Sequence, residues 1–234
     1  MATITQTTTI RATLDEFLRE QEERLSPATF ANYADVVWLL ESCLNGYGHE
    51  WLDADESERF ERLFDAGDEE AYCNLFGPEK IPEQVGSFLN WFMLRKVFAG
   101  QQLLKASTTV SKRLLAWLCD RGLIDAAGAA EAKAIAVAAA HDLPASDRLT
   151  RLLGDLCEGT PFARLPEHVE GEVVEDMLTI TRVEHGRLWF DDGIGPLKVP
   201  REASDLAKPG WSLFAALASV KGHWRLLEHG VVYP

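Results

Sequence analysis

The sequence lacks a long apolar run and the leader pattern of a secreted protein. No stretch approaches the roughly 20 apolar residues that a membrane-spanning helix needs. The first ten residues, MATITQTTTI, do not combine a basic start with an apolar core, so they do not have the pattern of a secretory signal peptide. These absences predict a soluble cytoplasmic protein with no membrane partner.

Cysteine is scarce, and the four cysteines are widely spaced. Cys43, Cys73, Cys119 and Cys157 include no pair at the spacing of a zinc-binding CxxC motif. Cys43 and Cys119 lie within helical patterns, where a free thiol usually behaves as a small buried side chain. We therefore expect buried free thiols rather than disulfides or zinc ligands.

The common catalytic and cofactor motifs are also missing. The chain has no HExxH, GxSxG, GxxxxGK[ST] or helix-opening GxGxxG pattern. The acidic stretch DADESE at 53–58 is similar to the start of a calcium-binding loop. However, Glu58 stands where such a loop requires glycine, and Phe64 stands where it requires glutamate. We therefore expect no enzyme activity, no metal and no cofactor.

Basic residues are outnumbered, and the net charge of −14 is unevenly distributed. Residues 1–125 contain 12 basic and 21 acidic residues, a net charge of −9. An acidic protein repels phosphate backbones at long range, so binding to nucleic acid would require a local basic face. The charge by itself favours an acidic module that interacts with other proteins.

The chain does contain enough apolar side chains for packed cores, arranged with two different periods. Hydrophobic residues make up 47% of the sequence, and seven residues are tryptophan. The apolar spacing is helical up to about residue 158 and strand-like beyond 171. This predicts an α+β protein with a helical bundle at 1–125, a helical extension at 126–158, a linker at 159–170 and a small antiparallel β-barrel at 171–234. The barrel is expected to be SH3-like or OB-like.

The helix signals are strongest at 27–47 and 103–125. Ser26 followed by Pro27 is typical of a helix start, because serine caps the free amides and proline lacks the amide that would go unpaired. In LLKASTTVSKRLLAWLCDRGLID, apolar or small residues recur at alternating spacings of three and four, and Gly122 provides a stop. Further helices are expected at 14–22, at 56–66 with Asp55 as its cap, at 81–96, at 126–141, and at 146–156 after a break at Leu143-Pro144.

Short strands separated by glycine and proline turns are predicted in the C-terminal segment. A turn at 184–186 joins the first two of them, as in a β-hairpin. The expected strands are 173–174 with 178–183, 187–190, 197–199, 211–220, 224–228 and 231–233, and a short helix is expected at 202–206.

Three segments of the first half carry a family resemblance: LDEFL at 14–18, LSPATFANY at 25–33 and TVSKRLLAWLCDRGLI at 109–124. Together they resemble the N-terminal, SAM-like core-binding domain of tyrosine recombinases, the phage-type integrases. The resemblance covers about half of the chain. It implies a helical bundle that grips one side of a DNA duplex.

The chain departs from that family in two respects. The region after residue 126 is too short, and of the wrong composition, to supply the arginines, histidines and tyrosine nucleophile of a recombinase catalytic domain. Tyr233 is therefore expected to pack on the barrel. The helix expected at 27–44 has no Lys or Arg, although this helix is commonly basic in the family. We expect a non-catalytic DNA-associated protein, with an acidic protein-interaction module as the alternative and an unrecognised enzyme as a third reading.

The resemblance implies that the last helix of the bundle approaches DNA. Lys105, Thr109 and Lys112 lie within two turns of one another, which allows a single phosphate-contacting face. The alternative is a solvated face paired with the nearby acidic residues. The candidate DNA-binding residues are Arg95, Lys96, Lys105, Thr109, Lys112, Arg113 and Arg121.

Aromatic side chains are the candidates for a second site, in the barrel. An exposed row of them would form a stacking platform of the kind that OB-like folds use for single-stranded nucleic acid. The alternative is that these rings fill a small core. The candidates are Trp189, Phe190, Trp211 and Trp224, with Arg182, Arg187, Lys198 and Lys221 as cations that could line the same face.

Overall fold

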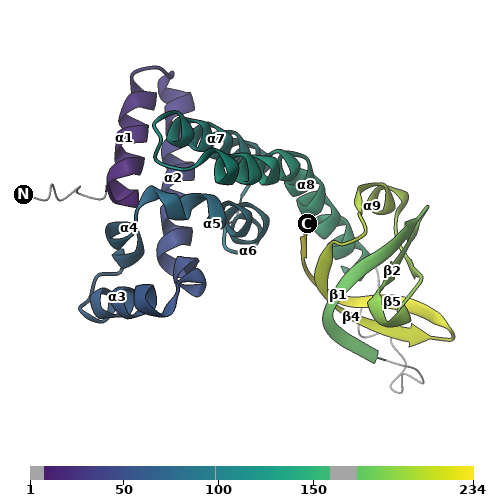
Figure 1. Ribbon diagram of the computed structural model, residues 1–234. Coiled ribbons are helices and arrows are strands. Elements are labelled where there is room, and N and C mark those ends of the chain that lie inside the picture. Colours follow the sequence, from purple (N-terminus) through teal and green to yellow (C-terminus); the bar gives the residue numbers. More distant parts are fainter. Residues whose placement is uncertain (1–7, 98, 159–172) are drawn as a thin grey trace, which may run out of the picture. The chain divides into compact units, whose positions relative to one another are not determined.

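A computed structural model describes residues 8–97, 99–158 and 173–234 (Figure 1). The chain forms two compact units, Met1–Ala140 and His141–Pro234. The predicted α+β class is confirmed, since the first unit is helical and the second contains a closed five-stranded barrel. The units divide within one long helix, and the linker predicted at 159–170 lies outside the described residues.

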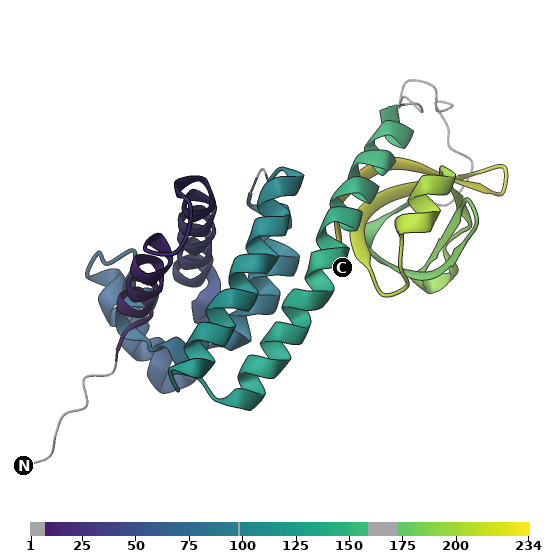
Figure 2. The same cartoon turned by 90° about the horizontal axis from the view of Figure 1, so that it is seen from above.

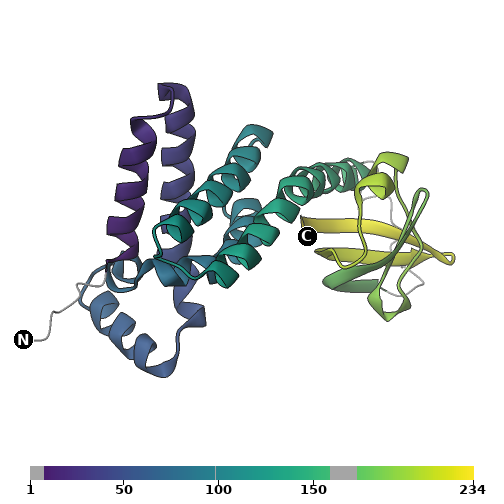
Figure 3. The same cartoon turned by 45° about the horizontal axis from the view of Figure 1, so that its top comes forward.

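The helical unit is built around a pair of antiparallel helices. These two, α1 and α2, lie side by side, and α7 packs against α2 (Figure 3). Their shared core contains Leu14 and Phe17 from α1, Leu44 from α2 and Leu114 from α7, all at most 1% exposed. The helices are α1 (Ile10–Glu22), α2 (Pro27–Tyr47), α3 (Ala54–Asp65), α4 (Ala71–Leu75), α5 (Ile81–Ser87), α6 (Met93–Arg95), α7 (Gln101–Asp120) and α8 (Ala126–Glu158), of which α8 continues into the second unit.

The N-terminal end of α2 and the C-terminal end of α7 lie where the sequence predicts them, but the residue that caps α3 is a different one. Ser26 caps α2, and Gly122 follows α7 with a φ of +67°. The cap of α3 is Asp53 rather than Asp55. Its carboxylate accepts the Glu56 amide at 2.9 Å, and the Glu56 carboxylate accepts the Asp53 amide at 3.2 Å. This reciprocal pair satisfies two free amides, which Asp55, already inside the first turn, cannot do.

The helix predicted at 81–96 is divided. A π-helical turn, Phe88–Phe92, separates α5 from α6. Phe88 and Leu89 are fully buried within this turn. Sequence periodicity cannot distinguish such an insertion from a continuous helix, because the wider turn accommodates only one extra residue.

Pro144 does not end a helix, so the predicted break at Leu143-Pro144 is wrong. Helix α8 continues through this proline. An internal proline costs about 3 kcal/mol, since it removes a hydrogen bond and its ring crowds the preceding turn. On its C-terminal side, Leu149, Leu152 and Leu153 are buried in the core of the barrel unit. That burial offsets the cost of the proline.

The second unit is a closed barrel with the strand order β1-β2-β3-β5-β4, viewed end on in Figure 2. Its elements are β1 (Val173–Glu184), β2 (Arg187–Phe190), β3 (Leu197–Lys198), α9 (Arg201–Leu206), β4 (Ser212–Val220) and β5 (His223–Tyr233). Neighbouring strands are antiparallel except β3 and β5, which pair in parallel. This order, with a helix between β3 and β4, is OB-like. The SH3-like alternative, built of antiparallel neighbours, does not fit.

The end of β5 is fastened to α8 by two hydroxyl groups. Ser146 Oγ donates a hydrogen bond to the Val232 carbonyl, and the Val232 amide donates to Thr150 Oγ1 at 3.0 Å. Val232 and Ser146 are both fully buried. Ser146 and Thr150, one helical turn apart, thus supply hydrogen bonds to both backbone groups of Val232. Without them, the buried amide and carbonyl would lose their hydrogen bonds to water and gain none in return.

Candidate nucleic-acid interface

A basic groove lies on the helical unit, between the end of α1, the start of α2, α7 and residue 133 of α8. It has a volume of about 560 Å³. Among the residues that the structure describes, no Asp or Glu lines it. The lining residues are the four cations Arg24, Lys112, Arg113 and Lys133 together with Gln21, Leu25, Tyr33, Thr109 and Ala116. We call this set the basic groove.

The four cations of the basic groove have no acidic partner. Within the described ranges, none of them forms an ion pair with a carboxylate. Arg24, Arg113 and Lys133 are exposed, and Lys112 is partly buried. Four neighbouring positive charges repel one another, so together they create a local potential that attracts an anion.

Helix α7 extends this basic surface along one face. Lys105, Thr109, Lys112 and Arg113 follow one another at the spacing of a helix face, opposite the buried side of α7. Lys105 and Arg113 are both exposed and lie about 12 Å apart along the helix axis. The Thr109 hydroxyl donates a hydrogen bond to the Lys105 carbonyl at 2.9 Å, so its hydrogen is already bonded within the helix.

The most acidic segment of the chain lies elsewhere. Residues 53–70 contain nine Asp and Glu against two Arg, a net charge of −7, which is half of the net charge of the whole chain. This segment packs near the C-terminal end of α2, where Phe60 stacks on His49. Tyr33, which lines the basic groove, lies about 20 Å from that end along the helix. The screening length at physiological salt is about 8 Å, so the acidic segment barely weakens the basic groove.

Arg121, predicted to contact DNA, lies outside the basic groove and forms contacts within the helical unit. Its guanidinium forms ion pairs with Glu16, at 2.9 Å, and with Glu20 of α1. It also lies 4.4 Å from the ring centroid of Trp117, whose indole N–H donates to Glu20 at 2.8 Å. These contacts hold the C-terminal end of α7 against α1, and the two carboxylates neutralise the charge of Arg121.

Arg95 and Lys96 lie apart from the basic groove. The Lys96 ammonium group sits over the rings of Tyr47 and Trp91, at 5.5 and 5.6 Å from their centroids. Tyr47 is the last residue of α2, about 20 Å along the helix from Tyr33. Of the predicted residues, the structure therefore brings only Thr109, Lys112 and Arg113 into the groove, with Lys105 further along the same face.

Two members of the basic groove were missed by the sequence analysis. Arg24 follows two glutamates at the end of α1, and Lys133 lies in an alanine-rich stretch of α8. Neither position carries a local signal, because each cation becomes significant only when its helix packs beside α7. Only the tertiary fold could reveal this convergence.

The barrel does not present the predicted row of four aromatic rings. Phe190 and Trp211 are 3% and 4% exposed and belong to the barrel core, so they cannot stack on an external base. Trp189 is partly exposed, but the Arg182 guanidinium covers it at 3.8 Å from the ring centroid. Trp224 is partly buried against the core. The prediction of a stacking platform is therefore wrong for Phe190 and Trp211.

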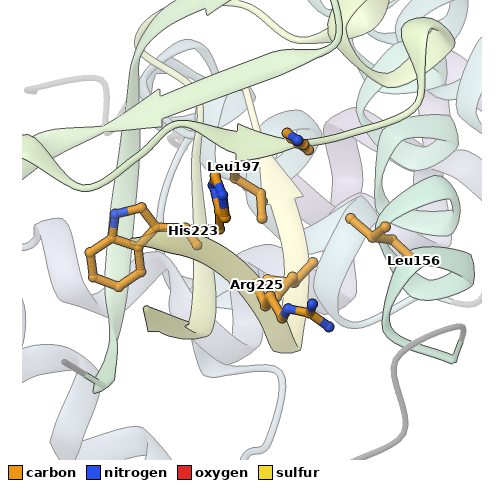
Figure 4. A pocket seen from close by; sticks show the side chains of 7 residues that line it. Leu156, Leu197, His223 and Arg225 are labelled. Atoms are coloured by element: carbon orange, nitrogen blue, oxygen red, sulfur yellow. The ribbon is translucent and has the colours of Figure 1, made fainter. Parts of the chain in front are cut away.

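A smaller basic pocket occupies the seam between β3 and β5 (Figure 4). It has a volume of about 240 Å³, below the roughly 300 Å³ typical of small-molecule sites. Lys198, His223 and Arg225 line it, and Arg187 is paired with Lys198 on the neighbouring strand. In the described part of the barrel unit, no acidic residue lines this pocket. The remaining lining residues are Leu156, Leu197, Trp224 and Leu226.

The described residues contain no cluster of potential metal ligands. No group of three or more His, Cys, Asp or Glu side chains is placed there to hold a metal ion. Asp142, which follows His141 in the sequence, forms an ion pair with Lys208. Burial raises the pKa of the Cys43 thiol to about 12, and it raises the pKa of Cys73 further, so both thiols stay protonated.

Comparisons with protein-family models, with curated proteins and with solved structures found no match to this chain. None of the helices in the described part combines the length and the apolarity needed to cross a bilayer. The functional inference therefore depends on the charge and geometry of the chain itself.

Proposed function

We propose that the chain is a non-catalytic DNA-associated protein that holds the phosphate backbone of a duplex in its basic groove. The observation that carries this proposal is the set of four cations in one groove with no acidic residue lining it. A phosphate backbone would relieve their mutual repulsion. It would also release the counterions condensed on the DNA.

The shape of α7 supports a duplex as the ligand. Lys105 and Arg113 extend over about 12 Å of one helix face. A duplex carries one negative charge per roughly 1.7 Å of axis, so several phosphates lie within reach of such a face. The resemblance to the core-binding domain of tyrosine recombinases, in which this helix approaches DNA, supports the same assignment.

The proposal limits what the contact can recognise. Contacts from Arg and Lys to phosphate oxygens fix position but carry no direct sequence information. We therefore expect binding with little sequence preference from the basic groove. The pocket lined by Lys198, His223 and Arg225 is a second candidate contact for a phosphate backbone.

Replacing the cations of the basic groove is expected to weaken DNA binding. We expect Lys112→Ala/Arg113→Ala and Arg24→Ala/Lys133→Ala each to raise the Kd of the full chain for a fluorescent duplex roughly 10-fold at low salt. Two duplexes of unrelated sequence should be affected equally, because only phosphate contacts are lost. Fluorescence anisotropy measures both effects.

The matched control removes the same charge from the acidic segment. Arg59→Ala/Arg62→Ala takes away two exposed cations near the other end of α2, and we expect it to leave the Kd within about twofold. The proposal fails if the wild-type chain does not bind duplex at low salt, or if the control pair costs as much affinity as the groove pairs.

A further inference from the structure

Three large apolar side chains of the helical unit are exposed, one in the middle of α2 and two after its C-terminal end. Trp38 is 65% exposed, Trp51 is 62% exposed and Phe64 is 49% exposed. Trp38 lies one helical turn before Ser42 and two turns before Asn45, so these three residues share one face of α2. Exposed apolar side chains mark an interaction surface where they gather into one patch, whereas single ones need no explanation.

This face of α2 borders an apolar groove of about 560 Å³. Its lining residues are Ser42, Asn45, Gly46, His49, Phe60, Phe64 and Glu69. The His49 ring stacks parallel to Phe60 at 5.4 Å, and Phe60 stacks on Phe64 at 5.6 Å. A Cβ on Gly46 would meet nothing within 4 Å, so the missing side chain leaves the groove open. We call the lining residues and Trp38 the aromatic groove.

The border of the aromatic groove is strongly negative. Phe60 and Phe64 belong to the segment 53–70, whose net charge is −7. Glu69 lines the groove, and Glu61 and Asp65 flank the two phenylalanines in α3. Within the described ranges, none of these three carboxylates forms an ion pair. The site thus offers stacked apolar rings beside three carboxylates that form no ion pair among the described residues.

We propose that the aromatic groove binds a cationic amphipathic helix of a partner protein. The apolar side chains of such a helix, at spacings of three and four residues, would pack on Trp38, Phe60 and Phe64. Its Lys and Arg side chains would face Glu61, Asp65 and Glu69. This inference is independent of the proposed DNA contact, because it uses another surface of the helical unit.

The charge decides between this partner and other occupants. A net charge of −7 repels nucleic acid and anionic lipid surfaces. A second copy of this chain, packed through the same surface, would place two such segments against each other, and like charges across an interface oppose binding. Only a basic partner gains from both the rings and the carboxylates.

The test uses the full chain and a designed probe. The probe is a peptide of leucine and lysine, about 16 residues long, with leucine at helical spacing. Its control has the same composition in an order that gives no apolar stripe. Isothermal titration at near-physiological salt should show saturable binding of one probe per chain, with at least a 10-fold larger Kd for the control peptide.

Paired variants locate the binding. Trp38→Ala/Phe64→Ala should raise the Kd for the probe at least 10-fold, and Glu61→Gln/Glu69→Gln should raise it several-fold. The matched controls are Val137→Ala/Met177→Ala, which removes other exposed apolar side chains, and Glu22→Gln/Glu23→Gln, which removes exposed charge at the end of α1. Both controls should leave the Kd unchanged.

Three outcomes would overturn the inference. The two peptides could bind equally well, or the Trp38→Ala/Phe64→Ala variant could bind the probe as tightly as wild type. Analytical ultracentrifugation could instead show self-association of the free chain that this variant abolishes, which would assign the surface to a second copy.

Discussion

Replacing Ser146 with Ala and Thr150 with Val is expected to lower the free energy of unfolding by about 2–4 kcal/mol in the double variant. Both hydroxyls bind the backbone of Val232, which is fully buried on β5. Without them, its amide and its carbonyl stay desolvated and unpaired, and each such group costs about 1–3 kcal/mol. The two losses share one residue, so their effects will not simply add.

Urea unfolding of the full chain measures this loss, and amide exchange locates it. The exchange of the Val232 amide should become much faster in the Thr150→Val variant, because its hydrogen-bond acceptor is gone. Thr109→Val is the control: this exposed hydroxyl bonds only within its own helix, and its loss should change stability by less than about 0.5 kcal/mol. An unchanged unfolding midpoint in the double variant would mean that α8 does not hold the end of β5.

Two glycines near the end of α2 are expected to respond in opposite ways to alanine. A Cβ on Gly48 would lie 2.6–2.9 Å from three ring atoms of Tyr72, a fully buried side chain. Overpacking of this kind costs about 1–3 kcal/mol, because the buried ring has no room to move. A Cβ on Gly46 meets nothing within 4 Å, so Gly46→Ala should stabilise the helix by up to about 1 kcal/mol.

Thermal unfolding of the two variants, measured side by side, tests this pair. We expect Gly48→Ala to unfold at a clearly lower temperature than wild type and Gly46→Ala at the same or a higher temperature. Equal stability of the two variants would contradict the close packing of Tyr72 on Gly48. Because Gly46 lines the aromatic groove, Gly46→Ala can also be tested for weaker binding of the amphipathic probe.

Patterns among neighbouring residues predicted the helix ends and strands that depend on those residues alone. Ser26-Pro27 marked the start of α2, and alternating apolar residues marked the strands of the barrel, except that the strands predicted at 224–228 and 231–233 form one continuous strand, β5. The continuation of α8 through Pro144 could not be predicted, because it depends on leucines that pack against strands distant in sequence. The local sequence favours a helix break at this proline, and the tertiary burial of the leucines offsets its cost.

The burial of Phe190 could have been predicted. Adjacent strand residues point to opposite faces of a sheet, so Trp189 and Phe190 cannot share one exposed surface. The observed pattern, with Leu188 and Phe190 inward and Trp189 partly exposed, follows this alternation. In contrast, no sequence pattern places Arg24 and Lys133 beside Lys112.

Net charge was a poor guide to the local surface of this chain. Half of the excess negative charge belongs to residues 53–70, and the basic groove lies towards the other end of α2. At separations well above the screening length of about 8 Å, the two regions act almost independently. One helical unit can therefore offer a cationic surface and an anionic surface to different partners.

The salt dependence of duplex binding tests the basic groove most directly. If its four cations each neutralise one phosphate, a plot of log Kobs against log salt concentration should have a slope of about −3 to −4. The slope should become less steep by about 2 in Lys112→Ala/Arg113→Ala. Absence of binding at low salt, or a slope that this variant leaves unchanged, would contradict the assignment of the basic groove to DNA.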